Sequence, residues 1–131
     1  MNDYKKISLK DLSENEKSLM ASGKIGLERE CFRINENNII SKRRHHESLG
    51  SALCNKYITT DFSEALLEFV TPPLYSNKSS LEFLQDIHHF VTKSIGNERL
   101  WPLSMPPSFQ KEADIPIAYY GKSNLGRFKR T

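Results

Sequence analysis

The sequence contains little cysteine and no long apolar segment. Its 131 residues include two cysteines, Cys31 and Cys54, and no Cys-x-x-Cys spacing. This excludes a zinc ribbon and a thioredoxin-type site, and both residues are predicted to be buried free thiols in a reducing compartment. No apolar run approaches the roughly 20 residues that a membrane-spanning helix needs, and no apolar signal core follows the first six residues. We therefore expect a cytoplasmic protein with no membrane partner.

The sequence also lacks a strong excess of charge of either sign. Its formal net charge is +3, and its basic residues fall in small groups at 42–44 and 127–130. Such groups are typical of solvated surface, so no nucleic-acid partner is expected. Glycine-rich phosphate loops, a Gly-x-Ser-x-Gly elbow and a cysteine–histidine nucleophile pair are missing as well. The histidine pairs 45–46 and 88–89 are predicted to lie in the core or on the surface, because adjacent helical residues cannot chelate one ion together.

Length and composition fit one domain of the α+β class. Hydrophobic residues make up 37% of the chain, enough for a moderate core. Strand-like and helix-like segments are mixed without a regular alternation, which favours α+β. The predicted elements are a helix over 13–21 with a Ser13/Glu16 capping box, a strand over 24–35, a turn over 35–38 with a return strand at 39–40, strands over 57–62 and 65–71, a helix over 80–95 with a Ser79/Glu82 capping box, and loops over 101–131.

Three acidic residues stand inside otherwise apolar, strand-like segments. They are Glu28, Asp61 and Glu68, and Glu30 would share a face with Glu28 because strand residues two apart point the same way. A carboxylate among apolar neighbours needs a partner if it is buried. Several carboxylates that converge from neighbouring strands would repel one another unless a divalent cation neutralised them, and Mg²⁺ suits a site built from oxygen ligands.

Two alternatives to a metal site remain open for these acids at this point. Half-exposed antiparallel strands alternate apolar and polar residues, so each acid could face water. Alternatively, Arg29 and Arg33 could pair with neighbouring acids across the sheet.

Several segments of the chain resemble the proteobacterial-type glutamate–cysteine ligases. The resemblance extends from about Gly23 to Lys129, with the family's segments in the same order and at similar spacing. The matching segments are Gly26–Glu30 with Arg33–Asn35, Leu49–Leu53, Ile58–Phe69, Trp101–Pro106 and Tyr120–Lys129.

The resemblance implies an ATP-dependent ligation in glutathione biosynthesis. ATP would phosphorylate the γ-carboxylate of L-glutamate, and the amine of L-cysteine would attack the acyl phosphate to give γ-glutamylcysteine. The implied fold is a glutamine-synthetase-like antiparallel sheet with flanking helices, incomplete in this chain. By the same resemblance the metal-binding acids are Glu28, Glu30, Asp61 and Glu68, which would hold Mg²⁺ against the phosphates of ATP. The implied substrate-binding residues are Phe62, Ser104, Met105, Pro106, Ser123, Asn124 and Arg127.

The chain departs from the family in length, because members of the family are several times longer. Residues 1–131 are therefore expected to form the N-terminal part of a catalytic domain, with residues 1–22 as a helical lead-in. The chain alone is expected to have little or no activity and to need a complementary C-terminal polypeptide. The alternatives are a non-catalytic remnant that binds a partner through an unpaired sheet edge, and a small module that binds Mg²⁺ or a nucleotide.

Overall fold

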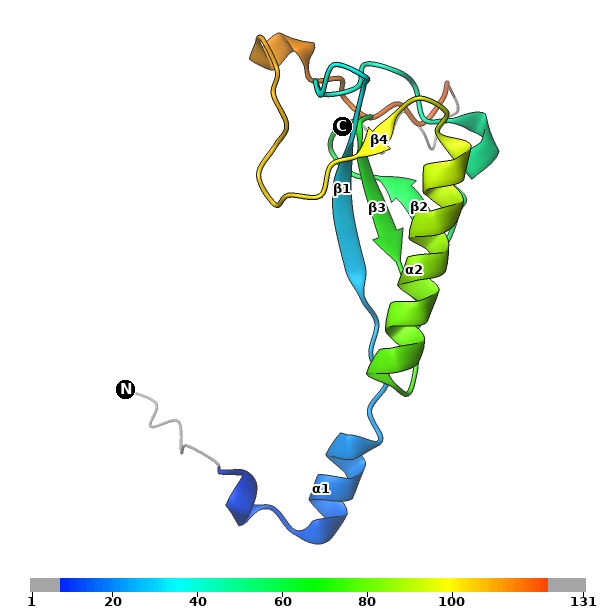
Figure 1. Cartoon of the computed structure of the whole chain (residues 1–131). Coiled ribbons are helices and arrows are strands. Elements are labelled where there is room, and N and C mark those ends of the chain that lie inside the picture. The colour runs from blue at the N-terminus through cyan, green and yellow to red at the C-terminus, as the bar shows by residue number, and fades with distance from the viewer. Residues whose placement is uncertain (1–7, 123–131) are drawn as a thin grey trace.

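A four-stranded antiparallel sheet with one long helix against it forms the centre of the molecule (Figure 1). The computed structural model describes residues 8–122. The strands are β1 (Glu28–Ile34), β2 (Ile58–Thr60), β3 (Leu66–Val70) and β4 (Arg99–Leu100), and their order across the sheet is β2-β3-β1-β4. The helices are α1 (Glu14–Ala21) and α2 (Asn77–Ser94), with single 3₁₀ turns at Leu9–Asp11, Glu47–Leu49 and Glu112–Asp114. The expected α+β class is confirmed.

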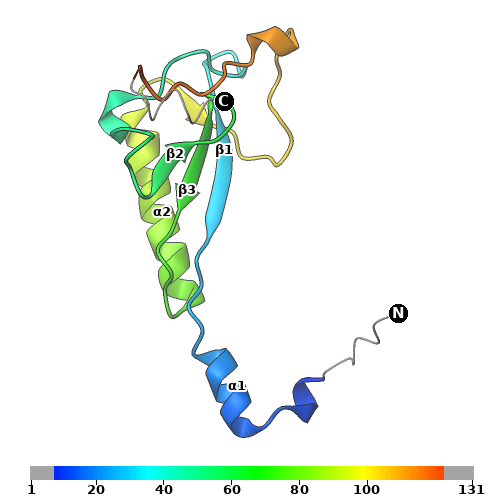
Figure 2. The ribbon, with the colours of Figure 1, turned by 180° about the vertical axis from the view of Figure 1, so that it is seen from behind.

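Helix α1 forms as its sequence predicts, but it is not buried against the rest of the described chain, residues 8–122. The Ser13 side chain accepts a hydrogen bond from the Glu16 amide, and the Glu16 side chain accepts one from the Ser13 amide. This reciprocal capping satisfies amide groups that the first turn would otherwise leave unpaired. None of the residues of α1 is buried. Both views show α1 away from the sheet, with the segment between the two elements leading from the helix to β1 (Figures 1 and 2).

The core lies between the sheet and α2. The buried cluster combines residues of one sheet face with residues of the helix: Cys31, Ile58, Leu67, Phe69, Ile87, Val91 and Ile95, together with Leu49. The pairing of β1 with β3 explains this face, because residues directly opposite each other in a sheet project to the same side. Cys31 lies opposite Leu67. Three strands and one face of α2 thus exclude water from a common interior.

The turn after β1 uses the residue type that its backbone needs. Asn38 has a φ of 60°, a left-handed conformation that asparagine adopts more readily than most residues. The Asn35 side chain accepts hydrogen bonds from the amides of Asn37 and Ile39. The predicted turn at 35–38 is confirmed. The predicted return strand is reduced to one antiparallel bridge, between Ile34 and Ile40.

Two details of the second helix differ from the prediction. Helix α2 begins at Asn77, and its cap is Ser76, whose hydroxyl accepts a hydrogen bond from the Ser79 amide. The Ser79/Glu82 capping box is therefore wrong, because an earlier serine with the same geometry starts the helix almost one turn sooner. Leu81 falls at the three- and four-residue spacing that predicts the apolar face of this helix, yet it is 52% exposed.

The two cysteines have different environments, so the prediction that both are buried is half wrong. Cys31 is buried on β1, and burial raises the pKa of its thiol to about 11. Cys54 is exposed in the turn that follows Ser51. Strand β4, for which the sequence analysis predicted no element, is only two residues long and pairs with Arg33 and Ile34 at the end of β1. Over residues 8–122 no helix has the length and apolar character needed to cross a membrane.

Candidate functional site

The sheet face opposite α2 carries a row of carboxylates. Glu30 on β1 lies directly opposite Glu68 on β3, and Thr59 on β2 lies opposite Glu68 on the other side. Glu28 is two residues from Glu30 on the same strand and therefore projects to the same face. Figure 2 looks onto this face and shows no helix across it. Three of the four predicted metal ligands thus share one open face.

Glu30 and Glu68 form a non-hydrogen-bonded pair of the antiparallel ladder, the kind in which the two side chains lie closer together. The amide of Arg33 donates to the carbonyl of Ala65, and the amide of Thr71 donates to the carbonyl of Leu27, so the odd-numbered residues of β1 form the hydrogen-bonded pairs with β3. The even-numbered residues then form non-hydrogen-bonded pairs, whose side chains approach more closely. Two carboxylates in such a position repel each other and favour a cation between them.

The fourth predicted ligand, Asp61, lies just beyond β2. It follows Thr60 at the start of the turn to β3, and its amide donates a 3.2 Å hydrogen bond to the carbonyl of Leu66. Its own carbonyl accepts a 3.1 Å hydrogen bond from the Tyr120 hydroxyl. Phe62, the predicted wall of a substrate pocket, is 70% exposed beside it. Both side chains are therefore accessible to a partner or ligand.

The donor atoms suit Mg²⁺ in type, but they do not converge into a finished metal centre. Carboxylate oxygens are the ligands that Mg²⁺ prefers. Across the described residues, however, no three or more His, Cys, Asp or Glu side chains are grouped closely enough to hold a metal ion. Of the two histidine pairs, His45 and His88 are partly buried, and His46 and His89 are exposed. The ring of His88, for example, lies edge-on to that of Phe69 with 6.3 Å between centroids.

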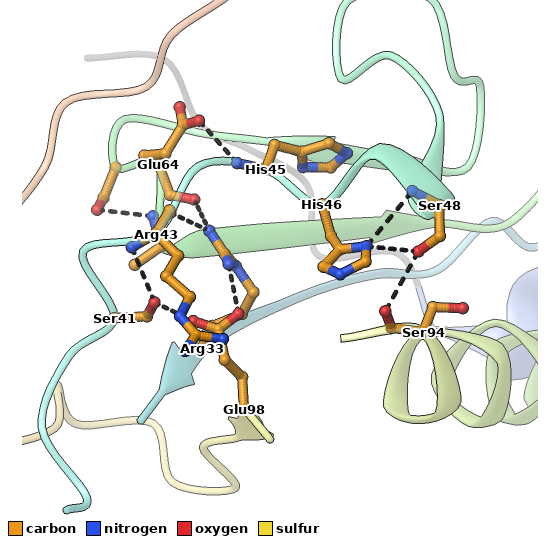
Figure 3. A network of polar contacts seen from close by, with 11 residues as sticks. Arg33, Ser41, Arg43, His45, His46, Ser48, Glu64, Ser94 and Glu98 are labelled. Atoms are coloured by element: carbon orange, nitrogen blue, oxygen red, sulfur yellow. Dashed lines mark hydrogen bonds and ion pairs between the residues drawn. The ribbon is translucent and has the colours of Figure 1, made fainter. Parts of the chain in front are cut away.

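A second set of charged residues is buried behind one end of the sheet (Figure 3). Arg33 on β1 and Glu98, which follows α2, are 0% and 3% exposed and form an ion pair at 2.6 Å. The Arg33 guanidinium also donates to the backbone carbonyls of Arg43 and Glu64. The Ser41 hydroxyl donates to the other carboxylate oxygen of Glu98. The alternative in which Arg33 pairs with a neighbouring acid across the sheet is therefore wrong for this residue, because its partner Glu98 comes from the segment after α2.

Glu64 is the other buried acid, and it joins two distant segments. Its carboxylate accepts a 2.8 Å hydrogen bond from the His45 amide and another from the Tyr119 amide. Its own amide donates to the carbonyl of Pro116. Because these contacts use both carboxylate oxygens, Glu64 fixes the segment before β3 against the chain around residues 116–119.

Beside Glu64 lies a cleft of about 410 Å³, where two segments of the chain meet. Its walls come from residues 44–53 and 119–121, together with Glu64. The Arg44 guanidinium stacks over the ring of Tyr119, 3.9 Å from the centroid, which closes one wall. Burial lowers the pKa of His45 in this region, and the positive charge of Arg33 lowers it further, so its ring favours the neutral form.

The predicted substrate-binding residues fall into two groups. Ser104, Met105 and Pro106 are exposed in the loop after β4, where the Trp101 indole donates a 2.7 Å hydrogen bond to the Met105 carbonyl. Ser123, Asn124 and Arg127 lie outside the described residues, one to five positions after the last residue of the structure that is described.

Sequence reasoning missed the structural roles of Glu64 and Glu98. Each acid is buried by partners that are distant in sequence, which no local pattern reveals. The one available signal for Glu64 is the run Asp61–Glu68, where it breaks an apolar strand pattern only four residues before Glu68. In a continuous strand that spacing would place Glu64 and Glu68 on one face, but β3 begins only at Leu66 and Glu64 lies in the turn before it.

Comparison with known proteins gives consistent matches. The family model described as glutamate-cysteine ligase matches residues 9–131. A glutamate–cysteine ligase of Aliivibrio salmonicida is 46% identical over 123 residues, which are 94% of this chain and 23% of that protein. The chain therefore spans about a quarter of the length of this relative.

Solved structures show the same likeness in three dimensions. A crystal structure of glutamate–cysteine ligase from Francisella tularensis in complex with AMP matches 80% of the chain with a TM-score of 0.76 and 37% identity, covering 21% of that protein. A bifunctional glutathione synthetase from Pasteurella multocida matches 80% of the chain with a TM-score of 0.73 and 34% identity, covering 15% of that protein.

Proposed function

Because this chain belongs to the glutamate–cysteine ligase family, we propose that it supplies one part of the active site of an ATP-dependent ligase. The reaction would join the γ-carboxylate of L-glutamate to the amine of L-cysteine as the first step of glutathione biosynthesis. The observation that carries the proposal is the acid row on the open face, where Glu30 and Glu68 are direct partners and Glu28 is their neighbour.

Each acid in the row has a distinct place in the proposed site. Glu28, Glu30 and Glu68 would hold Mg²⁺ from the sheet, and Asp61 would approach from the turn beyond β2. The metal, when bound, would offset the negative charge of the ATP phosphates. The open face suits this role because phosphates and metal need access that the face covered by α2 does not give. The AMP in the Francisella tularensis relative is consistent with nucleotide use in the family.

The substrate contacts follow from the exposed residues around this face. Phe62 would form part of the cysteine pocket, with Ser104–Pro106 and, outside the described residues, Ser123, Asn124 and Arg127 near the amino-acid substrates. A cytoplasmic location would suit the reaction, because free cysteine stays reduced there.

A complementary polypeptide is part of the proposal. The acids do not form a group of three that could hold a metal within residues 8–122, and the chain covers 23% of its Aliivibrio relative. We therefore place residues 1–131 in a catalytic domain, with residues 1–22 as its lead-in, and assign the remaining ligands to the polypeptide that completes that domain.

Glutamate- and cysteine-dependent ATP hydrolysis in the presence of Mg²⁺ tests this function. The chain would be assayed alone and with the unmatched remainder of the Aliivibrio salmonicida ligase added as a separate polypeptide. We expect turnover only in the mixture, and a loss of about 100-fold in Glu68→Gln. Glu82→Gln on the exposed side of α2 is the matched control, because it removes the same charge far from the row.

Two outcomes would redirect the proposal. Turnover by the chain alone that Glu68→Gln abolishes would show that no complement is needed. No turnover in the mixture, with both polypeptides folded by circular dichroism and bound to each other, would favour the non-catalytic, partner-binding alternative.

A further inference from the structure

The turn between β2 and β3 is paired with a segment from much later in the chain, residues 116–120. The Ala118 amide donates a 3.0 Å hydrogen bond to the carbonyl of Phe62. An isolated antiparallel bridge joins Ser63 to Ile117. The later segment therefore lies along the turn and supports it from outside the four-stranded sheet.

The side chain of Tyr120 holds both peptide groups that flank Asp61. Its hydroxyl lies 2.6 Å from the carbonyl oxygen of Thr60 and 3.1 Å from that of Asp61. The amide of Asp61 donates to the carbonyl of Leu66 at 3.2 Å. Because the backbone on either side of a Cα atom determines the direction of its Cα–Cβ bond, these contacts determine where the Asp61 carboxylate points.

Asp61 needs this support more than the other acids of the proposed site do. Glu28, Glu30 and Glu68 lie within paired strands, so the hydrogen bonds of the sheet fix their backbone. Asp61 follows the last residue of β2, and its side chain is exposed. A ligand beyond the end of a strand depends on neighbouring groups to keep the geometry that a metal requires. The Tyr120 hydroxyl is such a group.

The position of Tyr120 is itself fixed by its neighbours. The amide of Tyr119, one residue earlier, donates to the carboxylate of Glu64, which is 3% exposed. The Arg44 guanidinium stacks over the Tyr119 ring at 3.9 Å from its centroid. Tyr120 is partly buried beside them. Its hydroxyl thus projects from backbone that is tied down on the side facing the turn, as a positioning group requires.

We propose that Tyr120 is a positioning residue of the ligase, whose hydroxyl keeps the Asp61 carboxylate directed toward the Mg²⁺ that the acid row would hold. The proposal rests on the proposed function for the role of Asp61 and adds the group that orients it. Tyr120 acts through the backbone of Asp61. Loss of its hydroxyl should therefore weaken the cation site at one ligand and leave the acids of the sheet in place.

Binding of Mn²⁺ to the ¹³C-labelled chain tests the proposal without any ligase assay. Mn²⁺ is paramagnetic and broadens the NMR signals of the carboxylates near it. In the unsubstituted chain we expect broadening at the side-chain carboxylates of Asp61, Glu30 and Glu68. Tyr120→Phe keeps the ring and removes the hydroxyl, so broadening should be lost at Asp61 and retained at the other two.

A matched control and a metal-free measurement accompany this titration. Tyr57→Phe removes the same hydroxyl from a tyrosine whose ring packs edge-on against Phe83 of α2, with 5.2 Å between centroids, and should leave all three carboxylates as they were. Without metal, hydrogen exchange of the Asp61 amide should be about 2- to 10-fold faster in Tyr120→Phe, since one hydrogen bond that holds the turn is lost.

The Mg²⁺ dependence of turnover separates positioning from general support of the fold. It would be measured in the mixture of the chain with the remainder of the Aliivibrio salmonicida ligase. In Tyr120→Phe the Mg²⁺ concentration for half-maximal turnover should rise about 2- to 10-fold, with a smaller change in maximal turnover. A residue that only stabilises the fold would lower maximal turnover and leave the half-saturating concentration unchanged.

Three results would overturn the proposal. The first is equal broadening at Asp61 in Tyr120→Phe and Tyr57→Phe, and the second is loss of broadening at all three carboxylates together. The third is an unchanged half-saturating Mg²⁺ concentration in an active mixture. Absence of broadening at Asp61 in the unsubstituted chain counts with the first. Because the Mn²⁺ titration uses neither ATP nor the complementary polypeptide, it decides this proposal even if the ligase assay fails. Normal turnover with a failed titration leaves the proposed function standing.

Discussion

The buried acids and the acids of the open face carry the same chemical group in contrasting surroundings. Glu98 and Glu64 are 4% or less exposed, and their carboxylates are surrounded by donors from the same chain: a guanidinium, a hydroxyl and two backbone amides. Glu28 and Glu30 are exposed on a strand whose neighbour places Glu68 opposite Glu30. One set joins distant parts of the chain, and the other brings like charges side by side.

The contrast separates structural carboxylates from those that suit a ligand. A buried carboxylate without donors would cost several kcal/mol, so Glu98 and Glu64 are tied to the partners that the fold supplies. Exposed carboxylates are hydrated and do not need donors from the fold, and the repulsion between two of them makes a bound cation favourable. Substitutions in the two sets should therefore change stability in opposite directions.

The largest effect is expected for Glu98→Leu. This substitution leaves the Arg33 charge buried without its carboxylate and removes the acceptor of the Ser41 hydroxyl. We expect the free energy of unfolding to fall by about 3–5 kcal/mol, enough to unfold a marginal domain. Urea denaturation followed by circular dichroism measures it.

An acid on the surface of α2 provides the control for Glu98. Glu82 and Lys78 form an exposed pair at 3.8 Å, so Glu82→Gln should change the free energy of unfolding by less than about 0.5 kcal/mol. Equal effects of Glu98→Leu and Glu82→Gln would mean that the buried pair does not hold the end of α2 to β1.

A smaller loss is expected for Glu64→Ala. The amides of His45 and Tyr119 would lose their acceptor, which should cost about 2 kcal/mol in unfolding free energy and speed hydrogen exchange at those two amides. Glu64→Gln retains one acceptor oxygen and should cost about half as much. Unchanged exchange at Tyr119 in the alanine variant would contradict the joining role of Glu64.

The buried region should also make stability depend on pH through His45. Its pKa is lowered by burial and by Arg33, with Glu64 acting in the opposite direction. A lowered pKa means that the folded state binds the proton more weakly than the unfolded chain. The contribution of His45 to the free energy of unfolding is therefore constant above about pH 6.5, the ordinary pKa of histidine. As the pH falls below that value, the free energy of unfolding decreases by at most about 1.4 kcal/mol per pH unit.

Urea denaturation between pH 7.5 and 5.0 measures this dependence. The slope below pH 6.5 should be smaller in His45→Asn than in the unsubstituted chain. His89→Asn, which removes an exposed histidine of α2, should leave the slope nearly as it was. Identical slopes in all three proteins would show that protonation of His45 is not opposed by the fold.

The open acid face could be predicted from the sequence because its signal is local. Period-two alternation placed Glu28 and Glu30 on one side of a strand, and the apolar run around Glu68 marked a second strand. The register that puts Glu30 opposite Glu68 could not be predicted, since it depends on how two strands about 40 residues apart align.

The buried acids could not be predicted, because their partners are remote in sequence. Glu98 lies 65 residues from Arg33, and Glu64 lies 55 residues from Tyr119. Local signals also failed where two were equivalent: Ser76 and Ser79 are both suitable caps, and the sequence alone does not choose between them. Strand β4 is too short for any periodicity to mark it.

The smallest and most discriminating effect is expected for Glu30→Gln. Removing one of two like charges from a close antiparallel pair should raise the free energy of unfolding by about 0.2–1 kcal/mol at low salt. The gain should shrink in 1 M NaCl, because salt screens the repulsion between exposed charges. Urea denaturation at both salt concentrations measures it, with Glu82→Gln as the control for loss of an exposed acid. A loss of stability similar to that of Glu64→Ala would place Glu30 with the structural carboxylates and remove the basis for assigning this row to a ligand.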